Sequence, residues 1–294
     1  MKILITGSKG FVGNALTNEL KKRNHTVHDF DISKGHNILD KLGLLAAMEG
    51  VDCTIHLAAA LEGTKENIRR VNIEGTRNVV HSAIAQKVKK LVFMSSTAVY
   101  GFTNGAVHEE SEINPENEYE KSKAEGEVLV LEAKEKIHTS VVRSAMVLGA
   151  NEYWKKMFHM LEKKYPLPCR GKNKFQIIYV KELARAIATV AENGKNGEIY
   201  LVAGKEQPTL NEFCEIVQEE MGIEKGIKHI PSWAGLALGK VTRTKLLNKE
   251  NIRHISKERH YQIEKIEKLG FKQETTLKNA IKEIVEEFEK QKTK

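Results

Sequence analysis

Tyr119 and Lys123 have a spacing that suits proton transfer. The segment Tyr119-Glu120-Lys121-Ser122-Lys123 predicts a helix start, and residues four apart on a helix share one face. A tyrosine with an ordinary pKa of about 10 is protonated at neutral pH, so acid–base chemistry requires a nearby positive charge, which Lys123 supplies. Ser96 follows the predicted strand 90–94 and brings a hydroxyl to its carboxyl end. Tyr119 is therefore a candidate proton-transfer group.

A second pair, Tyr261 and Lys265, has the same spacing. No strand-end hydroxyl precedes it in the sequence. We interpret this second pair as surface residues, which shows that the spacing alone is a weak signal.

Three glycines, Gly7, Gly10 and Gly13, separate the apolar run 3–5 from a helical pattern that begins at Phe11. An apolar run without alternation is typical of a strand buried on both faces of a parallel sheet. A glycine turn before a helix lets the backbone approach a pyrophosphate, while the helix directs free N–H groups at the anion. The alternative is an ordinary turn in which glycine only relieves strain.

Asp31 ends the next predicted strand, 18 residues after Gly13. An acidic side chain about 20 residues beyond a glycine loop can bind a ribose 2′-hydroxyl, and it would repel a 2′-phosphate. The spacing therefore favours NAD over NADP as the cofactor, although Lys9 and Lys34 could weaken this preference.

Composition describes an ordinary globular protein. The chain has 294 residues, of which 40% are hydrophobic and 29% charged, and a formal charge of +8 that we interpret as a solvated Lys-rich surface. The sequence shows no long apolar run, signal-peptide pattern, metal-spaced cluster or nucleic-acid pattern, and its three cysteines are far apart. We therefore expect a cytoplasmic protein with no metal, no membrane span and no nucleic-acid partner.

The chain resembles extended short-chain dehydrogenase/reductases of the NAD-dependent epimerase/dehydratase type over nearly its full length. The matching segments are 6–13 with Asp31, 52–59, 72–78, 95–101, 119–123 and Arg143, with weaker matches at 179–180 and 269–271. Together with the alternating strands and helices, this resemblance implies an α/β fold: a Rossmann-type doubly wound parallel sheet with a smaller C-terminal substrate lobe. We expect an NAD(P)-binding domain at 1–149, to which 175–203 returns, and a substrate lobe from 150–174 and 204–294.

The resemblance also implies roles for individual residues. Ser96 would hold the substrate oxygen, Tyr119 would move the proton, and Lys123 would bind the nicotinamide ribose while lowering the tyrosine pKa. A homodimer is implied as well, paired through the helices of Asn72 and Tyr119. The residues assigned to the cofactor are Gly7, Ser8, Lys9, Gly10, Phe11, Val12, Gly13, Asp31, Asn37, Ile38, Leu57, Ala58, Ala59, Asn72, Ser95, Tyr119 and Lys123.

Three positions depart from the family pattern. Asn37 replaces a common aspartate near the adenine, Ser144 replaces the proline after Arg143, and Phe175 stands where sugar-nucleotide enzymes often have a diphosphate-binding arginine. Arg170, Lys172 or Lys174 could substitute for that arginine. The candidate substrate residues are Ser96, Thr97, Arg143, Trp154, Arg170 and Phe175; the aromatic residues could equally form the core of the small lobe.

Three functions fit this pattern. The first is an NAD-dependent epimerase or dehydratase acting on a nucleotide sugar. The second is a ketone reductase or alcohol dehydrogenase resembling dihydroflavonol reductases and 3β-hydroxysteroid dehydrogenases, favoured by Phe175 and the stretch 229–233. The third is a non-catalytic dinucleotide sensor, which would have no use for Ser96, Tyr119 and Lys123 together. We rank them in this order.

Overall fold

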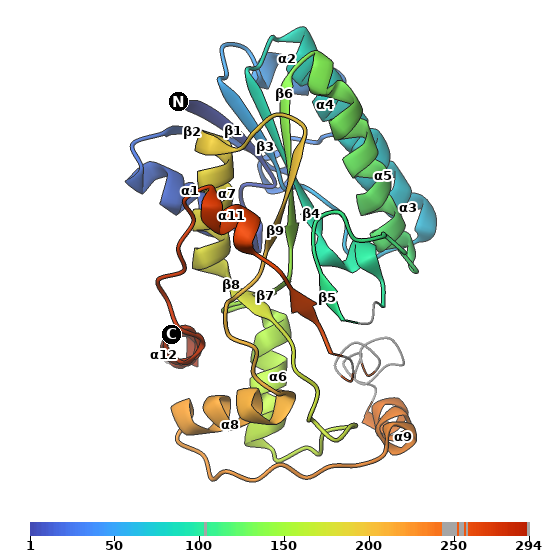
Figure 1. Ribbon diagram of the computed structural model, residues 1–294, viewed down its shortest axis with the longest axis vertical. Helices are drawn as coiled ribbons and strands as arrows, with labels where there is room; N and C mark the ends of the chain where they lie inside the picture. The colour runs from blue at the N-terminus through green and yellow to red at the C-terminus, as the bar shows by residue number, and fades with distance from the viewer. Residues whose placement is uncertain (103–104, 243–251, 253–255, 257, 293–294) are drawn as a thin grey trace.

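A twisted parallel sheet forms the upper half of the computed structural model, which describes residues 1–102, 105–242, 252, 256 and 258–292 (Figure 1). Within these ranges the main sheet has six strands in the order β2-β1-β3-β4-β6-β9. Their bounds are β1 Lys2–Thr6, β2 Thr26–Phe30, β3 Cys53–His56, β4 Lys90–Ser96, β6 His138–Ser144 and β9 Glu198–Val202. All neighbouring pairs are parallel, which confirms the predicted doubly wound sheet.

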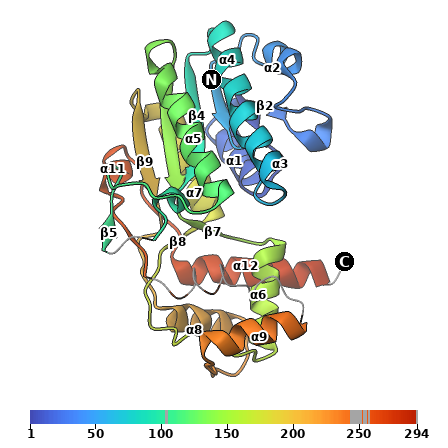
Figure 2. The same cartoon turned by 90° about the vertical axis from the view of Figure 1, so that its right-hand side faces the viewer.

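Helices cover both faces of this sheet. α1 (Phe11–Lys22) packs beside α7 (Val180–Asn193) on one face, and α3 (Lys65–Arg69), α4 (Gly75–Ala85) and α5 (Glu118–Glu132) lie on the other (Figures 1 and 2). α2 (Lys41–Ala47) packs on α4. The apolar run of β1 is fully buried between these layers, with Ile3 and Ile5 at 0% exposure. The chain runs from β1 to β2 on one side and then crosses past β1 to β3 on the other side, so the strand order reverses between β1 and β3. Ligands of open α/β sheets bind at the carboxyl ends of strands next to such a reversal.

A smaller group of helices forms the lower half of the molecule (Figure 2). Apolar side chains of α6 (Glu152–Glu162), α8 (Leu210–Glu220) and α12 (Leu277–Lys292) share one cluster. Thr209 and Glu212 form a capping box that starts α8, and the Thr276 hydroxyl accepts a hydrogen bond from the backbone N–H of Asn279 in the first turn of α12. The remaining elements are β5 Ala106–Val107, β7 Met146–Leu148, β8 Ile177–Tyr179, α9 Ser232–Thr242, β10 His260–Tyr261 and α11 Glu264–Lys268.

The segment 260–271 does not pack with the smaller lobe. Tyr261, Ile266 and Phe271 belong to the same apolar cluster as β1, β3 and β9. This corrects two expectations: part of 204–294 lies against the sheet, and Tyr261, with 6% of its side chain exposed, is a core residue rather than a surface one.

Among the described residues, none of the helices combines the length and the apolar character needed to cross a bilayer. Nor do three or more His, Cys, Asp or Glu side chains gather as a potential metal site in the part of the chain described here.

Candidate active site

The glycine loop lies between β1 and α1 at the carboxyl end of the sheet. Gly7 has φ +75°, and a Cβ atom there would lie 2.9 Å from the Ala58 nitrogen. A Cβ atom on Gly13 would lie 2.2 Å from the Gly7 carbonyl oxygen, so the helix can pack this closely only on glycine. No side chain caps the N-terminus of α1 at Gly10. Its free N–H groups and positive dipole end fit a pyrophosphate.

Asp31 immediately follows β2 and is nearly buried, with 8% exposure. Its carboxylate accepts hydrogen bonds from the backbone N–H groups of Lys9 and Ser33, both at 2.9 Å. Burial acts to raise the pKa of Asp31, but these hydrogen bonds and the charge of Lys9 hold it below its usual value. The group is thus an anion fixed beside the glycine loop, with lone pairs left for ribose hydroxyls. The Lys9 ammonium is paired with Asp29 rather than with Asp31.

The small residues after β3 form the next part of the crevice. Leu57, Ala58 and Ala59 are partly exposed at the strand end. Asn72 holds this segment in place: its amide oxygen accepts from the Ala60 N–H at 2.7 Å, and its amide nitrogen donates to the Ala60 carbonyl at 3.0 Å. Asn72 therefore shapes the wall of the crevice through its neighbours.

Ile38 and Asn37 lie beyond this wall. A Cβ atom on Gly75 would lie 2.4 Å from Ile38 Cδ1, so the glycine at the start of α4 makes room for this side chain. The Ile38 side chain is 6% exposed, whereas Asn37 is exposed and its amide oxygen accepts from the Leu39 N–H at 2.9 Å.

The three catalytic candidates come together in the structure. The Tyr119 phenol lies close enough to Ser96, at the end of β4, for the serine hydroxyl to lower its pKa. Lys123 lies one turn further along α5, with 3% of its side chain exposed and its Nζ 4.3 Å from the centre of the Phe93 ring. An Asn117–Glu120 capping box fixes the start of α5, and with it the position of Tyr119. A strand end and a capped helix thus hold these groups together.

Burial dominates the electrostatics of this site. It raises the pKa of Tyr119 to about 12, partly offset by the Ser96 hydroxyl. Burial also lowers the pKa of Lys123 to about 8, with Glu127 acting in the opposite direction. The protein alone therefore keeps Tyr119 protonated, and forming its phenolate requires a further positive charge nearby.

Ser95 and Arg143 differ from their expected roles. The Ser95 hydroxyl is hydrogen-bonded to Glu127, and only 2% of Ser95 is exposed. Arg143 is 4% exposed; its Nη2 donates to Glu127 at 2.7 Å, and its Nη1 donates to the Tyr100 hydroxyl and the Glu109 carbonyl. The structure thus turns both side chains into a buried network and does not bring Arg143 to the other substrate candidates.

Thr97, Trp154 and Phe175 lie around two adjoining pockets. Thr97 lines a small pocket with Tyr100 and Phe102, and Phe175 lines an apolar cavity of about 40 Å³ with Met146 and Tyr153. Trp154 also lines the apolar cavity, but it is 3% exposed, donates from Nε1 to the Val147 carbonyl and packs on Phe213, so it is at the same time a core residue of the lobe.

Arg259 was missed in the sequence analysis. It lines both of these pockets, and its backbone N–H donates to the carbonyl of Lys174, the residue before Phe175. Phe175 occupies the position at which related enzymes often have a diphosphate-binding arginine. Arg259 brings an arginine next to that position from another part of the chain. No local pattern identifies Arg259, because it lies 84 residues beyond Phe175 in the sequence.

Arg170 lies elsewhere. It lines a separate surface cavity with Lys172 and His229, and both Arg170 and Lys174 are exposed. Asn173 lines both this cavity and the apolar one.

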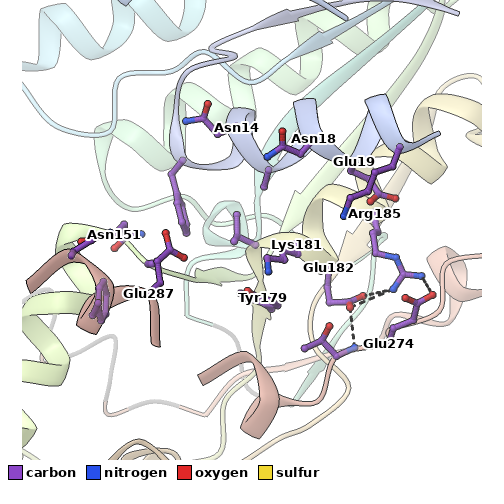
Figure 3. A pocket seen from close by; sticks show the side chains of 18 of the residues that line it. Asn14, Asn18, Glu19, Asn151, Tyr179, Lys181, Glu182, Arg185, Glu274 and Glu287 are labelled. Atoms are coloured by element: carbon purple, nitrogen blue, oxygen red, sulfur yellow. Dashed lines mark hydrogen bonds and ion pairs between the residues drawn. The ribbon is translucent and has the colours of Figure 1, made fainter. Parts of the chain in front are cut away.

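A cavity of about 1010 Å³ lies between α1, α7 and α12 (Figure 3). Phe11 lines it, but the three catalytic candidates do not. Several of its cations are already paired: Arg185 with Glu182 at 3.0 Å and with Glu274, and Lys181 with Glu283. These pairs join α7 to the C-terminal segments, so the cavity marks a crevice between the two halves of the molecule.

Comparisons with known proteins agree with this geometry. The model of the NAD dependent epimerase/dehydratase family matches residues 3–203. An uncharacterised protein of Sinorhizobium fredii is 30% identical over 249 residues, which cover 78% of this chain and 62% of that protein's length. The N-acetyl-alpha-D-glucosaminyl-diphospho-ditrans,octacis-undecaprenol 4-epimerase of Escherichia coli O157:H7 is 25% identical over 258 residues, covering 81% of this chain and 77% of the relative.

Among solved structures, the UDP-glucuronic acid 4-epimerase of Bacillus cereus in complex with NAD has the same fold. Its TM-score is 0.79 with 20% identity, and the match covers 99% of each chain.

Proposed function

Because the chain belongs to the NAD dependent epimerase/dehydratase family, we propose that it is an NAD-dependent enzyme that epimerises or dehydrates a sugar carried on a diphosphate, most simply a nucleotide sugar. The observation that carries this proposal is the placement of the Tyr119 phenol beside Ser96, with the buried Lys123 one helical turn further along α5, at the strand ends that also bear the glycine loop. A pure binding protein would not need this proton-transfer pair.

The chain's own residues have distinct tasks in this scheme. The α1 N-terminus and the glycine loop bind the pyrophosphate, Asp31 binds ribose hydroxyls, and Lys123 holds the second ribose. NAD supplies a centre that accepts a hydride from the substrate carbon. Ser96 holds the substrate hydroxyl, and Tyr119 removes and returns its proton.

The pKa of about 12 at Tyr119 makes deprotonation depend on nearby positive charge. Lys123 is placed one helical turn away, and an oxidised nicotinamide is positively charged. Proton removal is therefore favoured only when the cofactor is oxidised, which links the proton step to the redox state.

We propose that the substrate extends from Thr97 past Arg259 into the apolar cavity lined by Phe175 and Tyr153. The sugar would lie beside Ser96, Arg259 would bind the diphosphate, and the aromatic side chains would contact the carrier group. A guanidinium suits this task because it donates in a fork that matches phosphate oxygens.

A second candidate, net reduction of a ketone, is favoured by Phe175 and the apolar character of the cavity. An enzyme that returns its hydride within one turnover gains by retaining NAD, whereas a net reductase releases it. The purified protein is therefore denatured and its supernatant assayed for NAD, and the native protein is titrated with uridine and thymidine diphosphates. Retained NAD with diphosphate binding supports the first function; an empty protein that ignores diphosphates and oxidises NADH with a ketone supports the reductase.

We also propose a cytoplasmic homodimer paired through the outer faces of α4 and α5. Val128 on α5 leaves 52% of its side chain exposed, which supports an interface there. The three cysteines of the chain are free, as is usual in a reducing compartment. Sedimentation should report a dimer, weakened by Val128→Glu and unaffected by Leu42→Glu, a change at an exposed residue of α2.

A further inference from the structure

His56 ends β3 and is almost completely buried, with 1% exposure. Both ring nitrogens have hydrogen-bond partners: Nδ1 lies 2.6 Å from the Thr6 hydroxyl, and Nε2 lies 3.0 Å from the Thr76 hydroxyl. The imidazole therefore bridges the strand before the glycine loop and the helix α4. The mechanism above gives this residue no task.

The hydrogen bond from Thr76 to Asn72 determines which groups donate and which accept along this bridge. The Thr76 hydroxyl donates to the Asn72 carbonyl at 2.6 Å, and a carbonyl can only accept. Thr76 must then accept from the Nε2–H of His56, which leaves Nδ1 to accept from the Thr6 hydroxyl. The geometry thus specifies one neutral tautomer, with the proton on Nε2.

Both ends of the bridge reach the proposed active site. Thr6 directly precedes Gly7. At the other end, the Asn72 amide donates to the Ser122 hydroxyl at 2.9 Å, and Ser122 donates to the Tyr119 carbonyl at 2.7 Å. Two sets of hydrogen bonds thus meet at Asn72, whose backbone carbonyl accepts from Thr76 and whose side-chain amide donates to Ser122, and together they link Thr6 to the backbone of Tyr119.

The surroundings of His56 disfavour its charged form. Burial, and then the charge of Lys123, lower the pKa of His56 to about 3. The Phe93 ring lies between them, 5.6 Å from the imidazole and 4.3 Å from the Lys123 ammonium. A protonated imidazole would lose its bond from Thr6 and place a second cation beside Lys123.

We propose that His56 is a positioning residue that sets the glycine loop and the start of α5 relative to each other, so that the bound dinucleotide and Tyr119 are aligned. The inference rests on the proposed function. It assigns His56, Thr76 and Ser122 to one unit, because the hydrogen bonds on both sides of Asn72 hold the same residue in place.

Two substitutions each remove one of these hydrogen bonds while keeping a side chain of similar size. Thr76→Val removes the acceptor of the imidazole, and Ser122→Ala removes the link to Tyr119. Each should weaken NAD binding or lower turnover by about 10-fold, as expected for one lost buried hydrogen bond. The NAD affinity and turnover of the double variant should be no lower than those of the worse single variant. If the two substitutions caused independent packing defects, their fold-losses would multiply.

Thr54→Val is the matched control. Thr54 lies on the same strand with 0% exposure, and its hydroxyl has no hydrogen-bond partner in the described structure. This variant should bind NAD and turn over like the unmodified protein. Thermal unfolding of all variants checks that each remains folded.

Nitrogen NMR of the imidazole gives a readout that does not depend on NAD or substrate. At neutral pH the unmodified protein should show the proton on Nε2, and Thr76→Val should shift the tautomer balance. A proton on Nδ1, a charged ring, or a Thr76→Val variant that equals Thr54→Val in binding and turnover would overturn the proposal. If the unmodified protein does not bind NAD at all, the proposed function fails, and the tautomer measurement still tests these hydrogen bonds.

Discussion

Arg143 and Glu127 form a buried ion pair, with Arg143 Nη2 2.7 Å from Glu127 Oε2 and side chains that are 5% and 4% exposed. Arg143 belongs to β6 and Glu127 to α5, one turn after Lys123. The same carboxylate binds the Ser95 hydroxyl on β4. The pair therefore ties the strand of Ser96 and the helix of Tyr119 to a third element.

Removing one partner of this pair should be costly. Arg143→Met leaves the Glu127 carboxylate buried without its cation, and the free energy of unfolding should fall by about 3–5 kcal/mol in urea titrations. Replacing both partners by apolar residues should recover much of that loss. Lys205→Met, which breaks an exposed pair with Glu267, is the control and should change little. An equal fall in the free energy of unfolding for Arg143→Met and Lys205→Met would contradict the argument that burial makes the Arg143–Glu127 pair costly to break.

Tyr119→Phe should lower turnover by about 10²–10⁴-fold, because the phenol that moves the proton is gone. NAD binding, measured by calorimetry, should be retained. Tyr165→Phe, at a residue 38% exposed, serves as the control and should remain fully active. Full activity of the Tyr119 variant on an identified substrate would place the proton transfer on another residue.

Asp31 should set the choice of dinucleotide. Calorimetric titration should show tighter binding of NAD than of NADP, and Asp31→Ala should narrow the difference, because the carboxylate that repels a 2′-phosphate is removed. Asp29→Ala is the control, because it removes a neighbouring carboxylate that is paired with Lys9. Tighter NADP binding by the unmodified protein would contradict the assignment.

Arg259→Ala should weaken binding of uridine or thymidine diphosphate, with little effect on NAD. Losing a charge-assisted hydrogen bond of this kind corresponds to about a 10-fold or larger change in affinity. Lys174→Ala removes an exposed cation from the residue whose carbonyl accepts the Arg259 N–H, and it should have a smaller effect. A larger loss of diphosphate affinity in Lys174→Ala than in Arg259→Ala would contradict this assignment and favour Lys174, which the sequence had suggested.

His56 should make the fold sensitive to acid. Its pKa is about 3 when folded, against about 6.5 in an unfolded chain, so below pH 6.5 the unfolded state binds a proton that the folded state does not. Its contribution to stability is constant above that pH and declines as the pH falls towards 3, by up to about 1.4 kcal/mol per pH unit. Urea titrations across this range should show a shallower decline for His56→Phe. Equal slopes would mean that the buried ring is already charged or is not buried in solution.

The segments proposed to bind the cofactor could be recognised in the sequence because their signals are local. The glycines, Asp31 and the Tyr119–Lys123 pair each lie within one strand–turn–helix segment or one helical turn, where spacing fixes geometry.

The substrate half was less accessible because it depends on contacts between distant segments. Arg259 reaches the Phe175 cavity from the far end of the chain, and no periodicity predicts that approach. Arg143 follows a strand end, as a ligand would, but Glu127 on another element turns it into the core. The prediction that Tyr261 is a surface residue was wrong for the same reason. Its two-residue strand β10 pairs with β5, and the sequence around Tyr261 does not predict that pairing.

The position of β9 in the chain bears on how the protein is synthesised. β6 pairs with β9 over Ser140–Ser144, but β7, α6, β8 and α7 are all translated between them. A nascent chain that ends before residue 198 therefore carries β6 as an unpaired sheet edge, which can pair with other chains. Translation pauses within 150–197 should thus promote aggregation, whereas pauses after 203 should not.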